Sequence, residues 1–201
     1  MTDLKTIKKL GQLHLKSEGF YQGAIDGIWG KVSTAAEVAY HRKKSPSSTM
    51  AKALVALAEK EVGVKEKPLN SNRGKRVEEY QAATWLEGTG WPWCAAFICW
   101  LCREAGMPKA KRPQTAGAWD FEKYAKKMGG KLIKPAAKDK VRAGDIVIFT
   151  FSHIGLAVAD EADGLVKTIE GNTDASGSRE GGGVYRKTRR KSQIRSIIRI
   201  S

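Results

Sequence analysis

The spacing of the apolar residues changes along this chain, and that change constrains the fold more than any other feature. As far as residue 105, apolar side chains recur every three or four positions, as on one face of a helix. From residue 145 they alternate with a period of two, in segments rich in β-branched and aromatic residues, as in strands. Helices followed by antiparallel strands predict an α+β domain.

The same periods predict the individual elements of this domain. Helices are expected at residues 50–63, 73–86 and 93–105, and strands at residues 145–151, 154–159 and 165–170. Residues 171–183 are polar and rich in glycine, which predicts a loop. Residues 193–200 alternate weakly and could close the sheet.

A short polar segment at residues 45–49 predicts a linker, and it divides the chain into residues 1–44 and residues 50–201. In the first part, Leu4, Ile7 and Leu10 recur at near-helical spacing and predict a helix that ends near residue 19. Four glycines among residues 19–30 indicate tight turns, and a second helix is expected to begin at residue 33 or 34.

The net charge of +15 predicts a polyanionic partner, because 36 Lys and Arg residues face only 21 acidic ones. Nucleic acid, anionic lipid and bacterial wall polymers all fit, and solubility alone remains an alternative. No run of 18 apolar residues is present, so no membrane-spanning segment is expected. The first ten residues lack the apolar core of a secretory signal, and three cysteines do not make a disulfide framework. We therefore expect folding in a reducing cytoplasm.

The three cysteines, Cys94, Cys99 and Cys102, all lie within one predicted helix. Their C-x4-C-x2-C spacing matches the start of an iron–sulfur pattern, but the fourth cysteine is missing and the residues between them favour a helix. On a helix, the first two cysteines lie about 140° apart around the axis and cannot share one metal ion. No metal site is predicted here.

Cys94 differs from the other two cysteines because it lies in the first turn of its helix. Unpaired N–H groups and the helix dipole favour an anion at that place, and the thiolate is the nucleophilic form of cysteine. The same N–H groups could stabilise an oxyanion during acyl transfer. Cys94 is the candidate nucleophile, whereas Cys99 and Cys102 are expected to be inert apolar filling.

A nucleophilic thiol needs a base, and His153 is the candidate because it begins a predicted strand, whereas His14 and His41 are expected to be solvated. A four-residue hairpin loop would place residue 153 opposite Glu170, with Asn172 as the diagonal neighbour. Either side chain could accept a hydrogen bond from one ring nitrogen and leave the other nitrogen facing the thiol. An error of two residues in the length of this loop would exchange the roles of Glu170 and Asn172.

Four motifs in order resemble the CHAP domain, a cysteine, histidine-dependent amidohydrolase/peptidase family. They are Trp93-Cys-Ala-Ala-Phe-Ile-Cys-Trp100, Ala143-Gly-Asp-Ile-Val-Ile-Phe149, Ser152-His-Ile-Gly-Leu-Ala157 and Ile169-Glu-Gly-Asn-Thr173. The resemblance covers about residues 50–200 and implies a papain-like fold, with helices packed on a small antiparallel sheet. It also implies an enzyme that cuts amide bonds in peptidoglycan without a cofactor.

Carried onto this chain, the resemblance implies Cys94 as nucleophile and His153 as general base, with Glu170 and Asn172 as the orienting polar groups. Trp91 and Trp93 could wall the substrate groove, although core packing is the alternative for large aromatic residues beside an active-site helix. No Asp-rich loop of the kind that holds calcium in some CHAP domains occurs, so no metal is expected.

Residues 1–44 resemble a small all-α peptidoglycan-binding module. The matching motifs are Gly19-Phe-Tyr21, Ile25-Asp-Gly-Ile-Trp-Gly30 and Ser33-Thr-Ala-Ala36. Asp26 and Gly27 are expected to form a turn. Tyr21 and Trp29 could stack on sugar, or could simply hold the helices together.

The combined prediction is a phage endolysin that waits in the host cytoplasm and then degrades the bacterial wall. The bond that it cleaves would be either the N-acetylmuramoyl–L-alanine amide or a peptide bond of the stem or cross-bridge. Basic residues 186–191 could add attraction to an anionic wall or outer membrane, or could form a solvated loop. The alternatives are a non-catalytic wall-binding protein and a basic nucleic-acid-binding protein, although the sequence has no zinc knuckle or stacking motif specific for nucleic acid.

Overall fold

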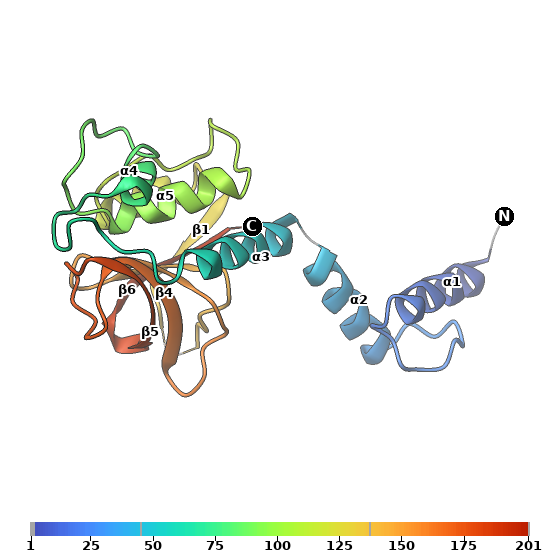
Figure 1. Ribbon diagram of the computed structural model, residues 1–201. Helices are drawn as coiled ribbons and strands as arrows, with labels where there is room; N and C mark the ends of the chain where they lie inside the picture. Colours follow the sequence, from blue (N-terminus) through green and yellow to red (C-terminus); the bar gives the residue numbers. More distant parts are fainter. Residues whose placement is uncertain (1–2, 45, 137, 201) are drawn as a thin grey trace. The chain divides into compact units, whose positions relative to one another are not determined.

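The computed structural model describes residues 3–44, 46–136 and 138–200, and the chain divides into two compact units, residues 1–49 and 50–201 (Figure 1). The segment that predicts a linker includes residue 45, which lies outside the described residues. Helix α3 (Pro46–Glu61) begins at the next residue, so residues 46–49 of the predicted linker are helical. That helix therefore begins four residues before the position that its apolar spacing predicts.

The first unit contains helices α1 (Leu4–Ser17) and α2 (Lys31–Lys44). Its small core consists of Leu15, Tyr21 and Ala36, with partly buried aromatic side chains around them. The apolar residues that predict α1 are exposed, Leu4 by 65% and Leu10 by 58%. The glycine-rich turn packs against a different side of α1, where the interior residues are Leu15 and a buried glutamine.

That glutamine, Gln12, organises the turn between the two helices. Its amide nitrogen donates to Asp26 Oδ1 at 2.9 Å and to the carbonyl oxygen of Ile28 at 3.0 Å. Its oxygen accepts a hydrogen bond from Gly27 N at 2.9 Å. Asp26 also accepts from Ile28 N at 2.8 Å, which is the local geometry of an Asx turn.

The second unit is a mixed helical and antiparallel structure, which confirms the predicted α+β class. Besides α3 it contains α4 (Lys75–Gln81), α5 (Cys94–Glu104) and the 3₁₀ segments η1 (Trp119–Tyr124) and η2 (Lys191–Gln193). Its strands are β1 (Gly130–Ile133), β2 (Ile146–Phe149), β3 (Ile154–Ala157), β4 (Leu165–Thr173), β5 (Gly183–Arg190) and β6 (Ile194–Ile200). They form one sheet in the order β1-β6-β2-β3-β4-β5.

Two of the six strands, β1 and β5, were not expected from the sequence, and β4 extends into the predicted loop as far as Thr173. The two unexpected strands are the edges of the sheet. Edge strands carry charged residues on their open side, so their apolar alternation is weak. In β5, four of the eight residues are Lys or Arg, which hides the period of two.

Helix α5 packs against β3 and β4, and α4 packs against α5 (Figure 1). All nine residues from Cys94 to Cys102 are buried, so α5 lies inside the larger core rather than on its surface. A second cluster lies on the other side of β2, because Ile146 and Ile148 belong to the larger core and Val147 and Phe149 to the smaller one. Strand β2 is thus buried on both of its faces. Among the described helices, none has the length and apolar character needed to cross a membrane.

Candidate active site

Cys94 is the first residue of α5, as its position in the sequence predicts. The first intrahelical hydrogen bond runs from Phe97 N to the carbonyl oxygen of Trp93 at 2.9 Å. The N–H groups of Cys94, Ala95 and Ala96 therefore have no carbonyl acceptor within the helix. The Cys94 side chain is close to fully buried, with the residue only 7% exposed. A thiol in this place lies at the positive end of the helix dipole.

Cys99 and Cys102 lie deeper in the same helix and do not share these properties. The Cys99 thiol donates to the carbonyl oxygen of Thr115 at 3.4 Å, and all three cysteines are free thiols. Burial raises the pKa of Cys102 to about 12 and raises the pKa of Cys99 well above its usual value. Both thiols stay protonated near neutral pH, which fits a packing role.

His153 follows the tight turn between β2 and β3, and its side chain is fully buried. Its carbonyl oxygen accepts a hydrogen bond from Phe149 N at 2.9 Å, which closes the turn. Its ring is stacked with the rings of Phe149 and Phe151, each at a centroid distance of 6.0 Å with interplanar angles of 18° and 16°. This aromatic stack fixes the plane of the imidazole ring.

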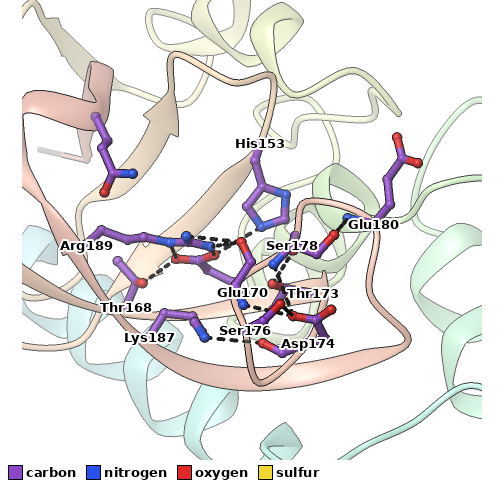
Figure 2. Close-up of polar contacts among 12 residues, drawn as sticks. His153, Thr168, Glu170, Thr173, Asp174, Ser176, Ser178, Glu180, Lys187 and Arg189 are labelled. Atoms are coloured by element: carbon purple, nitrogen blue, oxygen red, sulfur yellow. Dashed lines mark hydrogen bonds and ion pairs between the residues drawn. The ribbon is translucent and has the colours of Figure 1, made fainter.

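Glu170 on β4 contacts the imidazole ring: His153 Nε2 lies 3.1 Å from Glu170 Oε2, and neither side chain is exposed (Figure 2). The direction of approach departs from that of an ideal hydrogen bond, so the contact is better described as an ion pair. Burial lowers the pKa of His153, but the nearby Cys94 thiol and Glu170 carboxylate outweigh this effect and raise it to about 9. The imidazole ring thus has both the Cys94 thiol and the Glu170 carboxylate near it, and its protonated form is favoured there.

The register that predicted this contact was wrong by two residues. In the structure Leu156 pairs with Ile169 and Ala157 with Thr168, so residue 153 lies opposite position 172 rather than position 170. The extra residues of the β3–β4 connection turn away to bond another loop. Asp160 Oδ1 accepts from Ala143 N at 3.0 Å, and a neighbouring glutamate likewise holds the preceding loop.

Although the register is shifted, Glu170 and Asn172 do not exchange roles. A Cβ atom on Gly155, which lies across from Glu170, would come within 2.7 Å of Glu170 Cγ. The glutamate side chain therefore passes over a position that has no side chain and reaches His153 diagonally. Because glycine leaves this space open, the longer carboxylate rather than the amide meets the ring.

Asn172 instead holds the start of α5. It lies at a bulge in β4 with a φ of 57°, a left-handed conformation that asparagine adopts more readily than most residues. Its Oδ1 accepts from Trp93 N at 2.8 Å, and its Nδ2 donates to Gly181 O at 3.0 Å and to Asn72 Oδ1 at 3.2 Å. The predicted role of orienting the histidine thus falls to Glu170, while Asn172 fixes the backbone next to Cys94.

Arg189 on β5 is a site residue that the sequence analysis missed. Its Nε donates to Glu170 Oε1 at 2.9 Å and its Nη2 to Glu170 Oε2 at 2.6 Å (Figure 2). Burial raises the pKa of Glu170, but Arg189 and then His153 outweigh it and lower this pKa to about 2. The guanidinium lies over the rings of Phe149 and Phe151, 5.5 Å and 5.2 Å from their centroids. Four of the eight residues of β5 are Lys or Arg, so no alternation of residue type in the sequence marked Arg189 as the buried one.

Three other basic residues of this segment, Arg186, Lys187 and Lys191, also contact the rest of the fold. Arg186 pairs with Glu59, and Lys191 Nζ lies 3.2 Å from Glu161 Oε2. Lys187 Nζ donates to the carbonyl oxygen of Ala175 at 2.7 Å. The solvated loop that was one reading of residues 186–191 is instead strand β5 and the start of η2.

Of the two tryptophans expected near the groove, Trp93 has no exposed surface. Its Nε1 donates to Glu66 Oε1 at 2.8 Å, and its ring packs on Tyr80 at a centroid distance of 5.4 Å. Trp93 is therefore a core residue, which was the alternative for it, and it cannot contact a substrate directly. Trp91 is half-buried, with its Nε1 donating to the carbonyl oxygen of Gly88 at 3.2 Å.

Tyr21 and Trp29, the two residues of the first unit that could stack on sugar, both contribute to its packing. Tyr21 is 4% exposed and its hydroxyl donates to Ala24 O at 2.8 Å. The half-buried Trp29 covers Gly11, where a Cβ atom would lie 2.8 Å from the indole ring. Near them lies an open hollow of about 450 Å³ with Phe20 and Lys31 in its lining. Within residues 3–44, 46–136 and 138–200, no three His, Cys, Asp or Glu side chains group as metal ligands.

A comparison with known protein families finds a match that falls on this site. Residues 86–172 match the CHAP domain. CHAP domains are typically cysteine- and histidine-dependent amidohydrolases or peptidases. The CHAP match contains Cys94, His153, Glu170 and Asn172, and it ends before the strand that carries Arg189. No curated protein matches the chain.

Proposed function

We propose that this protein hydrolyses an amide bond of bacterial peptidoglycan through the thiol of Cys94. The observation that carries the proposal is the grouping of Cys94, His153 and Glu170, in which a buried imidazole ring has a carboxylate oxygen 3.1 Å away and a helix-end thiol near it. The match of this segment to the CHAP domain supports peptidoglycan as the substrate. Free thiol groups at the site are what such chemistry requires.

In the first half of the reaction, His153 takes the proton of Cys94 and the thiolate attacks the carbonyl carbon of the amide. The tetrahedral intermediate carries its negative charge on the former carbonyl oxygen. The N–H groups in the first turn of α5, which have no acceptor within the helix, would stabilise this oxyanion. The imidazolium then gives its proton to the leaving nitrogen, the C–N bond breaks, and an acyl thioester with Cys94 remains.

In the second half, water attacks the thioester carbonyl while the neutral imidazole accepts a proton from it. The C–S bond breaks, the carboxylic product leaves, and the thiol is restored. Throughout both halves Glu170 stays ionised, so it can stabilise each imidazolium without taking its proton. This division of roles is the one known from thiol and serine triads in general.

The finer parts of the proposal concern the bond and the setting. The bond is either N-acetylmuramoyl–L-alanine or a peptide link of the stem or cross-bridge. We infer an endolysin, held in the host cytoplasm until lysis, in which the two helices before residue 45 bind the wall. Mass spectrometry of digested peptidoglycan would identify the bond, because an amidase leaves free muramic lactyl carboxylates and an endopeptidase leaves new peptide ends.

The direct test is the fall in turbidity of purified cell walls with the wild type and two matched cysteine variants. Cys94→Ala should reduce the lysis rate at least about a thousandfold, because it removes the nucleophile. Cys99→Ala, which lies in the same helix and removes the same atom, should retain most of the activity. Equal lysis by wild type and Cys94→Ala would refute the thiol mechanism. Cosedimentation of wild type with walls that it never lyses would favour the non-catalytic wall-binding alternative.

A further inference from the structure

We propose that Arg189 is a positioning residue, which keeps the Glu170 carboxylate ionised and aimed at His153 so that the imidazole ring can activate Cys94. This inference rests on the proposed function for its catalytic meaning, but its geometric basis is independent of the substrate. Arg189 lies on β5, outside the segment that matches the CHAP domain.

The first argument is the complete use of both carboxylate oxygens. Oε1 accepts from Arg189 Nε at 2.9 Å and from Thr168 Oγ1 at 2.5 Å, and Oε2 accepts from Arg189 Nη2 at 2.6 Å (Figure 2). His153 Nε2 approaches Oε2 as well, at 3.1 Å. Arg189 is the only one of these donors that contacts both oxygens, so it fixes the plane of the carboxylate.

The second argument is that Arg189 is itself rigidly held. Its side chain is only 9% exposed, and both Nη atoms donate to the carbonyl oxygen of Gly177 at 3.2 Å. Its guanidinium lies over Phe149 and Phe151, and the same two rings are stacked with His153. One aromatic pair therefore contacts both the arginine and the histidine that share Glu170, so the three charged groups keep one arrangement.

The third argument is electrostatic. A carboxyl group with no exposed surface would tend to hold its proton, because burial disfavours the charged form. The charged and titratable groups near Glu170 are His153 ahead of β3, which has Cys94 of α5 near it, and Arg189, Tyr185 and Lys187 on β5. Of these, Lys187 directs its ammonium group to backbone carbonyl oxygens, and Tyr185 faces Glu170 in the register of the strands. Arg189 is thus the permanent positive charge that offsets the burial of Glu170.

The sign of the effect follows from these contacts. Without Arg189, the buried carboxyl group would become protonated at higher pH and would no longer stabilise an imidazolium. The thiolate of Cys94 would also lose part of the positive potential around it. Both changes move the acid side of the activity profile to higher pH, by about one unit or more, as is usual for the loss of a close opposite charge.

The test measures the rate at which iodoacetamide alkylates Cys94 between pH 4 and pH 9, followed by mass spectrometry of the cysteine-containing peptide. This rate reports the thiolate directly and needs no wall substrate. Arg189→Gln should move the midpoint of the profile up by about one pH unit, a tenfold slower reaction below the midpoint. Arg189→Lys keeps the positive charge, so its midpoint should lie closer to that of the wild type than the midpoint of Arg189→Gln does. Arg186→Gln, which removes the same charge from the exposed side of β5, should match the wild type.

An alkylation profile of folded Arg189→Gln that coincides with those of wild type and Arg186→Gln would overturn the inference, even if the melting temperature falls. If Arg189→Gln does not fold, Thr168→Val decides instead, since it removes one hydrogen bond to Glu170 without changing the charge. Its profile should shift in the same direction by a smaller amount, and an unchanged profile would equally refute the inference. A shifted profile in a protein that does not lyse walls would instead leave Arg189 in its role and refute the proposed function.

Discussion

The substitution Gly155→Ala tests whether the reach of Glu170 across the sheet matters for activity. The added Cβ atom would lie 2.7 Å from Glu170 Cγ, whereas carbon atoms in normal contact are about 3.5–4.0 Å apart. The Glu170 side chain must therefore move by about 1 Å. The carboxylate is held by Arg189, Thr168 and His153, so a movement of that size breaks at least one of these contacts.

Two magnitudes follow from this displacement. Inserting one methyl group into a closely packed site costs about 1–3 kcal/mol of stability, and the protein should still fold. A catalytic group misplaced by about 1 Å can cost about a hundredfold in rate, or about 2.7 kcal/mol of transition-state stabilisation. We therefore expect Gly155→Ala to reduce kcat/KM for wall lysis about a hundredfold, with only a modest loss of thermal stability.

A double-mutant cycle with Glu170→Ala identifies the cause of the loss. Alanine at position 170 has no Cγ atom, so the collision with the new methyl group disappears in that background. Gly155→Ala should then have little further effect on the residual activity, and the two effects should be strongly non-additive. Wild-type activity in the single variant would refute the reasoning. So would an equal hundredfold loss in the Glu170→Ala background, because the methyl group would then act elsewhere.

Two further predictions concern stability. The pKa of His153 is raised from 6.5 to about 9, so its contribution to the free energy of unfolding is full below pH 6.5 and is lost as the pH rises through 9. The pKa of Glu170 is lowered from 4.5 to about 2, so its contribution is lost as the pH falls from 4.5 towards 2. Urea unfolding across this range should give highest stability between pH 4.5 and 6.5, and the alkaline fall should be absent in His153→Gln. Asn172→Gly keeps the left-handed backbone but leaves Trp93 N without its acceptor, so it should cost about 1–3 kcal/mol in urea unfolding. Asn70→Gly, at an exposed position with a φ of 61°, should not destabilise the protein.

The sequence was sufficient to predict the central elements of the second unit because burial and periodicity agree there. Helix α5 and the strands β2, β3 and β4 have strong apolar patterns, and all four were expected, although β4 runs three residues further than predicted. The position of Cys94 at the start of its helix followed from the same local rules. Local rules also identified the turn role of Asp26, whose bonds run to residues on either side of it.

The edges of the sheet could not be predicted in this way. β5 contains mostly polar and charged residues. The partner of Arg189 is Glu170, which lies on β4 and is 19 residues earlier in the sequence. The strand register places Arg189 opposite Val166, so only the lean of two long side chains along the sheet brings it to Glu170. A pattern of residue types contains no information about that lean. In the first unit, similarly, the apolar residues that predict α1 are exposed, while the structure buries the side of the helix that carries Gln12.

The site also explains why an incorrect register still gave the correct partner for His153. A shift of two residues keeps every side chain on its own face of the sheet, so position 170 remained on the same face as position 153. The length of glutamate then compensates for the diagonal distance, and Gly155 provides the free space. Asparagine is one methylene shorter, and at the bulge it turns towards Trp93 N instead. The choice between the two side chains thus depends on reach and open space, which is why a glycine two residues after the histidine is as informative as the carboxylate itself.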